Sequence, residues 1–169
     1  MTAGADVIAR EYVAAAMPFT VRRTVDWSEC DPAGVVYAGN YVEYFFSAMR
    51  LFRRHGLNEP IGAPGAVSEF DTPGKAVNVV FMGPLWPYDA FDIRIYTNAP
   101  RTSTIDIFAH AVRCDDGSSV FVGRTTSICV SSSDRRKVVP VPEGFRAKIE
   151  SYREKSGFPD VLKQVEHRA

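Results

Sequence analysis

Apolar and polar residues alternate from Phe19 onward, which is the period of a half-buried β-strand. The apolar face of this alternation comprises Phe19, Val21, Val25 and Trp27. A different pattern starts at Tyr41, where apolar residues occupy nearly every face of a helix. Such a helix is enclosed by other structure rather than lying on a surface. The two segments therefore predict a strand that leads into a wrapped central helix.

Local signals place the ends of this helix. Asn40 is expected to cap it, and Glu43 stands where a capping box would need an acidic residue. We expect the helix to reach His55, because Gly56 suits the position that follows a helix. A short helix is also predicted over residues 5–17.

The rest of the chain reads as strands followed by one more helix. Prolines and an Asp-Asp-Gly turn separate five apolar segments, which are Ala66–Asp71, Ala76–Met82, Ala90–Asn98, Ser103–Arg113 and Ser119–Val130. A helix is predicted from Glu143 to Lys155, and the polar tail beyond Gly157 is expected to be loosely held. This order predicts an α+β fold in which a curved antiparallel sheet wraps one long helix.

Composition narrows the class of protein. The chain has 169 residues, of which 46% are apolar, enough for one domain with a full core. Its formal net charge is zero, so no general attraction to nucleic acid or membranes is expected. The three cysteines are odd in number and lack a zinc-site spacing, which favours a reduced setting without a metal. No signal peptide and no run of eighteen apolar residues is visible, so we expect a cytoplasmic protein.

Residues 29–41, between the strand and the helix, hold the main candidate chemistry. Asp31 opens a tight turn with proline second and Gly34 fourth, which type I turns favour. The first N–H groups of the following helix, at Ala38 and Gly39, lack internal partners and carry partial positive charge. A carboxylate beside such donors suits hydrolysis of an activated carbonyl, because the donors can stabilise an oxyanion. Asp31 can equally be a turn residue alone, and Gly39 can serve close substrate approach or merely ease the turn.

Aromatic side chains next to this junction are candidates for an acyl or aryl pocket. Tyr37, Tyr41 and Phe45 follow the turn, although aromatic residues on a central helix are more often simple core. Cys30 has no evident histidine partner and is expected to be an inert thiol.

The Asp31-Pro-Ala-Gly-Val-Val-Tyr37 motif and the Asn40-Tyr41 pair, together with the order of elements, resemble hotdog-fold thioesterases of the 4-hydroxybenzoyl-CoA thioesterase family. The resemblance covers residues 19–145, the expected hotdog domain. Residues 1–18 form an N-terminal extension, and residues 146–169 a C-terminal helix and tail.

This resemblance implies an acyl-CoA thioesterase. The aspartate matching Asp31 is the family's nucleophile or general base, and the backbone N–H matching Ala38 polarises the thioester carbonyl. Coenzyme A enters as part of the substrate, with no separate cofactor, and Arg101 matches the region of coenzyme A contacts. Family members form homodimers whose sheets join edge to edge, commonly paired into homotetramers, with active sites at subunit interfaces.

The chain departs from the family pattern at two positions. Many members have histidine or tyrosine where Ala38 stands, and an acidic residue where Phe46 stands. A backbone donor survives the first change, whereas a side-chain role does not. Two alternatives to a thioesterase therefore stay open: a non-catalytic protein that binds acyl-CoA or an acyl-carrier thioester, and a hotdog hydratase or dehydratase. The hydratase class usually needs a histidine, and none lies near Asp31 in the sequence.

Overall fold

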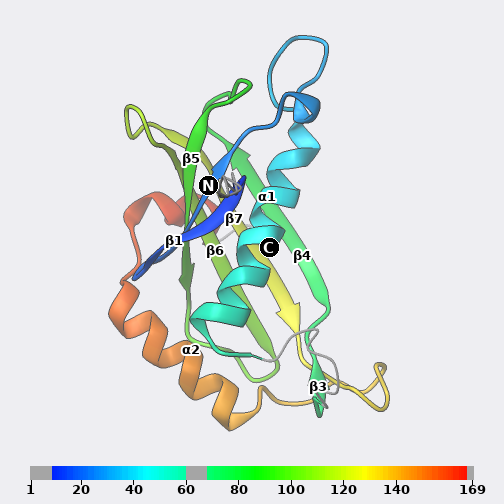
Figure 1. The fold of residues 1–169 in the computed structure, drawn as a ribbon. Helices are drawn as coiled ribbons and strands as arrows, with labels where there is room; N and C mark the ends of the chain where they lie inside the picture. Colours follow the sequence, from blue (N-terminus) through cyan, green and yellow to red (C-terminus); the bar gives the residue numbers. More distant parts are fainter. Residues whose placement is uncertain (1–8, 60–67, 167–169) are drawn as a thin grey trace, which may run out of the picture.

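The structure is a computed structural model that describes residues 9–59 and 68–166 (Figure 1). Six antiparallel strands form one sheet in the order β1-β2-β5-β6-β7-β4. Their bounds are β1 Glu11–Ala16, β2 Phe19–Thr24, β4 Gly74–Phe81, β5 Ala90–Thr97, β6 Thr104–Arg113 and β7 Ser119–Ile128. Two short strands, β3 (Phe70–Asp71) and β8 (Val130–Ser131), pair separately.

One long helix, α1 (Ala38–Leu51), crosses one face of the sheet and continues into a π-helical turn, η2 (Phe52–Gly56) (Figure 1). The other helical segments are η1 (Trp27–Glu29), α2 (Glu143–Ser156), η3 (Asp160–Leu162) and α3 (Lys163–Glu166). The predicted α+β fold, a long helix against an antiparallel sheet, is confirmed.

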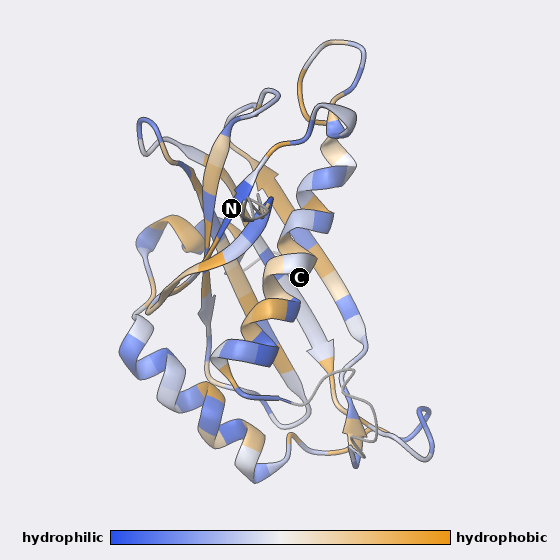
Figure 2. Ribbon diagram, in the orientation of Figure 1, coloured by the Kyte–Doolittle hydropathy of each residue, from blue (hydrophilic) through white to orange (hydrophobic). Residues whose placement is uncertain are grey.

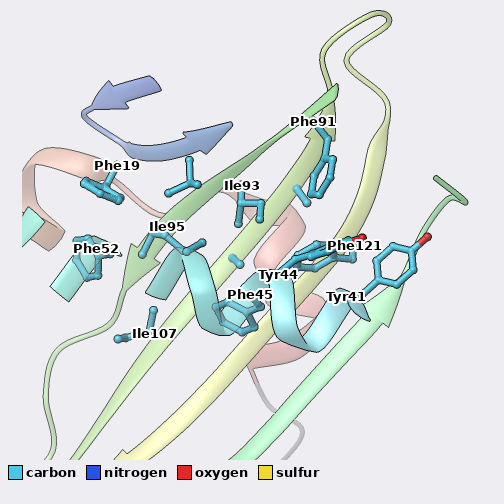
Figure 3. Close-up of a cluster of buried hydrophobic side chains, with 14 of the residues drawn as sticks. Phe19, Tyr41, Tyr44, Phe45, Phe52, Phe91, Ile93, Ile95, Ile107 and Phe121 are labelled. Carbon is cyan, nitrogen blue, oxygen red and sulfur yellow. The ribbon is translucent and has the colours of Figure 1, made fainter. Parts of the chain in front are cut away.

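Aromatic rings fill the space between α1 and the sheet. Tyr44 and Phe45 of α1 are buried and meet Phe91 and Phe121 of the strands (Figure 3). A Cβ on Gly123 would lie 2.9 Å from the Phe45 ring, so only glycine lets the helix approach β7 this closely. The helix α2 is largely hydrophilic and buries one side only, whereas the strands behind α1 alternate hydrophobic and hydrophilic segments (Figure 2). The sheet therefore buries one face of α1, whereas Glu43 and Arg50 on the helix are exposed. The prediction that the helix is enclosed on nearly every face is wrong for the single chain, although its place against the sheet is confirmed.

Residues 158–166 pack against the opposite face of the sheet. Leu162 and Val165 are fully buried and form a cluster with Tyr96, Phe108 and Val122 of the sheet. For residues 158–166 the expectation of a loosely held tail is wrong, because Phe158 and Val161 also pack against this apolar patch of strands.

The N-terminal part of the chain differs from the sequence prediction. Residues 11–16 form β1, which pairs with β2, rather than the predicted helix; residues 5–8 of that prediction lie outside the described part. The alternation predicted to reach Trp27 stops at Thr24, because Asp26 caps η1 with a capping box. Trp27 is consequently 70% exposed instead of buried.

Three further predictions have mixed outcomes. The helix starts at Ala38, not after Asn40, and Tyr37 occupies the capping position without a side-chain bond. Only Phe70–Asp71 of the strand predicted over 66–71 is formed, and residues 66–67 lie outside the described part. The other four predicted strands and the helix from Glu143 are confirmed to within a few residues.

Candidate active site

The turn that follows Asp31 is closed by main-chain hydrogen bonds. The Asp31 N–H donates to the Val35 carbonyl over 2.8 Å, and the Gly34 N–H donates to the Asp31 carbonyl over 2.9 Å. Gly34 adopts a φ of +81°, which glycine tolerates best. The predicted tight turn is confirmed.

The Asp31 carboxylate is half-buried and only partly engaged. Its Oδ1 accepts a hydrogen bond from the Ala33 N–H over 2.8 Å. Among the described residues no cation pairs with it, and no second donor contacts it. One carboxylate oxygen is thus free to take a proton or to attack an electrophile.

The start of α1 is tied to the strand side of this turn. The Glu29 carbonyl accepts hydrogen bonds from the Tyr37 N–H over 3.0 Å and from the Asn40 Nδ2 over 2.7 Å. The Asn40 amide therefore clamps the turn instead of capping the helix, which explains the error in the predicted helix start. Asp31 lies two residues after Glu29, and Ala38 lies one residue after Tyr37. Both therefore stand close to residues that the Tyr37–Glu29 hydrogen bond joins.

Two backbone donors stand open at the helix start. Within the described residues, neither the Ala38 N–H nor the Gly39 N–H donates to an acceptor, and both residues are exposed. The helix dipole adds partial positive charge there. A carbonyl oxygen that develops negative charge could be stabilised at this point without rearrangement of the protein.

The three aromatic candidates occupy different environments. Tyr37 is 61% exposed, and a Cβ on Gly39 would lie 2.7 Å from its ring, so this glycine makes room for Tyr37. Tyr41 is buried, and its hydroxyl accepts a hydrogen bond from the Leu85 N–H over 3.1 Å. Burial raises the pKa of the Tyr41 hydroxyl. Phe45 is fully buried (Figure 3), so substrate contact by Tyr41 or Phe45 stays a prediction.

Arg101 lies far from Asp31 within one chain. It lines a pocket of about 480 Å³ at the beginning of β4, whose other lining residues are Lys75, Ala76, Val77, Asn78, Arg124 and Thr126. The start of α1 packs instead against the end of β4, where Tyr41 contacts Phe81. Six residues of extended strand separate Lys75 from Phe81, which is about 20 Å. The sequence did not indicate the partners of Arg101, because only the β4–β7 register brings Lys75 and Arg124 to one place.

A cysteine nucleophile, a metal site and a membrane-spanning helix each set requirements against which the described residues can be compared. Burial and nearby acidic groups raise the pKa of the Cys30 thiol, which opposes a nucleophilic role. No cluster of metal-ligating side chains occurs in the described ranges. No helix in those ranges is long and apolar enough to cross a membrane.

Comparison with known proteins identifies the family. A family model described as the thioesterase-like superfamily matches residues 25–149, which include the Asp31 turn and α1. The chain belongs to the thioesterase-like superfamily. A comparison with curated proteins found no match to this chain.

Solved structures show the same fold as this thioesterase-like chain. A hypothetical protein from Staphylococcus aureus, solved in complex with CoA, covers 97% of the chain and 98% of its own length at 16% identity and a TM-score of 0.74. A gentisyl-coenzyme A thioesterase covers 77% of the chain and 98% of its own length at 19% identity and a TM-score of 0.66. A 1,4-dihydroxy-2-naphthoyl-CoA thioesterase from Synechocystis covers 78% and 94% at 20% identity and a TM-score of 0.65. At these identities the likeness concerns the fold alone.

Proposed function

We propose that this protein hydrolyses an acyl-CoA thioester to a carboxylate and free coenzyme A, as a thioesterase of the 4-hydroxybenzoyl-CoA type. One observation carries the proposal: the Asp31 carboxylate has a free oxygen, and the helix that begins seven residues later, at Ala38, starts with two open N–H donors. Membership of the thioesterase-like superfamily supports thioester hydrolysis in general.

In the general-base route, Asp31 takes a proton from water while the water oxygen attacks the thioester carbon. The Ala38 and Gly39 N–H groups bind the resulting oxyanion. Collapse of this intermediate breaks the carbon–sulfur bond, and the CoA thiolate takes the proton from Asp31. In the nucleophilic route, Asp31 itself attacks and expels the thiolate, and water then cleaves the mixed anhydride.

Coenzyme A binding is proposed at the pocket that holds Arg101. Arg101 is 61% exposed and shares the Asp106 carboxylate with the buried Arg124, so that Lys75 adds the further positive charge beside this group. Guanidinium and ammonium groups suit phosphate oxygens. One acyl-CoA molecule with its thioester at Asp31 and its phosphates at Arg101 of the same chain would have to span the length of β4. We therefore propose that Asp31 and the Arg101 pocket that bind one substrate belong to different subunits.

A homodimer through β4 satisfies this requirement. β4 is an edge strand of the sheet, and Val77 and Phe81 on it are each about half exposed. Antiparallel pairing of two β4 strands would bring the Phe81 end of one chain, next to α1, towards the Lys75 end of the other. We propose that Asp31 of one chain and the pocket of its partner form one complete site.

Thiol release from a panel of short, medium-chain and aromatic acyl-CoAs tests the activity. We expect wild-type protein to release free thiol from at least one substrate. Binding of acyl-CoA by calorimetry without thiol release across the whole panel would instead indicate a non-catalytic acyl-CoA binder. That alternative is favoured by Ala38 and Phe46, which replace side chains that many thioesterases of this type carry there.

Subunit mixing tests the shared site. Dimers that combine one Asp31→Asn chain with one Arg101→Ala chain contain one site with both native residues and one with neither. We expect the native KM and about half the native turnover from such mixed dimers. If both residues acted within one chain, every site would carry one defect, and no site with native kinetics would remain.

A further inference from the structure

The side chain of Glu29 lies at the junction between the Asp31 turn and α1 and is almost fully engaged. Its Oε1 accepts a hydrogen bond from Arg23 Nη2 over 2.5 Å. Its Oε2 accepts from the Tyr44 hydroxyl over 2.9 Å and from the Asp26 N–H over 2.8 Å. Three donors from β2, from α1 and from the residue before η1 therefore converge on one carboxylate.

Arg23 extends this cluster to β1. Its Nη1 lies 3.3 Å from Glu11 Oε1, and its guanidinium carbon lies 4.5 Å from the centre of the Tyr44 ring. Glu11 in turn accepts a hydrogen bond from the Ser47 hydroxyl of α1 over 2.6 Å. The side chains of Arg23, Glu11 and Glu29 are each 18% exposed, so water screens these contacts only weakly.

The same residue holds the turn through its main chain. The Glu29 carbonyl accepts from both Tyr37 and Asn40 at the start of α1, as described above. Asp31 follows Glu29 by two residues, and Ala38 follows Tyr37 by one. The Glu29 carbonyl thus links the segment that carries Asp31 to the start of α1.

We infer that Glu29 is a positioning residue, which sets the Asp31 carboxylate against the N–H donors of α1 through its bonds to Arg23 and Tyr44. This role rests on the proposed thioesterase function. Displacements of about 1 Å can cost about a hundredfold in rate when reacting groups must meet in a fixed geometry.

Two substitutions of different severity test the inference. Glu29→Gln keeps an acceptor for Asp26 and Tyr44 but removes the charge opposite Arg23. Tyr44→Phe removes one donor and keeps the ring beneath Arg23. We expect kcat for the best acyl-CoA to fall by about 10- to 100-fold in Glu29→Gln and by about 3- to 10-fold in Tyr44→Phe, with KM changed less than about threefold. The control is Asp92→Asn, which breaks the two-bond ion pair of Asp92 with Arg22 on the other side of β2 and should leave kcat unchanged.

A second readout does not depend on activity. Exchange of the hydrogen-bonded amides of Asp31, Tyr37 and Asn40 should accelerate at least about tenfold in Glu29→Gln and stay unchanged in Asp92→Asn. Native exchange rates together with native kcat in both Glu29→Gln and Tyr44→Phe would overturn the inference. If wild-type protein released no thiol, the proposed function would fail, and the exchange comparison would still decide whether Glu29 orders the turn.

Discussion

Asp31 and Asp106 are the same side chain in opposite situations. Asp106 is 6% exposed, and it accepts hydrogen bonds from Arg124 over 3.2 Å, from Thr126 over 2.6 Å and from Arg101 over 3.2 Å. Asp31 is half-buried and accepts only the Ala33 N–H of its own turn among the described residues. A saturated carboxylate holds structure, whereas a carboxylate with a free oxygen remains available for chemistry. The comparison predicts that substitutions at the two sites affect different properties.

The largest effect is expected for Asp31→Asn. Positioned acid–base groups contribute about 10²–10⁴-fold to rate, so kcat should fall at least about a hundredfold. The asparagine Oδ1 can still accept the Ala33 N–H, so the turn and the melting temperature should be preserved. Steady-state thiol release and thermal unfolding measure the two quantities. Turnover at the native rate would remove Asp31 from the mechanism.

Asp106→Asn is expected to act on stability instead. Arg124 is only 5% exposed, and the substitution leaves its charge without the counter-charge it has in the sheet. Breaking a buried pair from one side typically costs about 3–5 kcal/mol. Urea unfolding should show this loss, while kcat per folded molecule stays native. An unchanged unfolding midpoint would mean that the pair contributes nothing.

Leu162→Ala tests the comparison between the Asp31 turn and the outer face of the sheet, where Leu162 packs. Leu162 is fully buried against the outer face of the sheet, and truncation of such a side chain costs about 2–3 kcal/mol at a peripheral site. Exchange of the amides in residues 158–166 should accelerate, and exchange in the Asp31 turn should not. Equal acceleration in both segments would show that the two regions are coupled.

Arg101→Ala should give the smallest effect. An exposed cation that contacts a phosphate contributes about 1 kcal/mol, so KM for acyl-CoA should rise about fivefold with kcat unchanged. Arg22→Ala serves as the control, because Arg22 is also partly exposed and pairs with Asp92 away from the pocket. An equal rise of KM in both variants would indicate a general charge effect.

The sequence indicates the features that depend on near neighbours. The type I turn at Asp31 is predicted because aspartate, proline and glycine at fixed positions favour it. The helix α1 is predicted because apolar residues recur along it, between turn signals at both ends. The features that the sequence does not indicate depend on contacts between residues that are far apart in the chain. Residues 11–16 become a strand through pairing with β2, and the Glu29 carbonyl takes the Asn40 amide that would otherwise cap the helix. Likewise, the tail docks because Leu162 meets Phe108, and the Arg101 pocket depends on the strand register.

The most direct test compares Asp31→Asn and Asp106→Asn side by side, with single-turnover thiol release and urea unfolding measured on the same preparations. Our account predicts that thiol release falls at least about a hundredfold only in Asp31→Asn, and that unfolding shifts by about 3 kcal/mol only in Asp106→Asn. Loss of both properties in both variants, or native thiol release in Asp31→Asn, would contradict the division between a catalytic and a structural carboxylate.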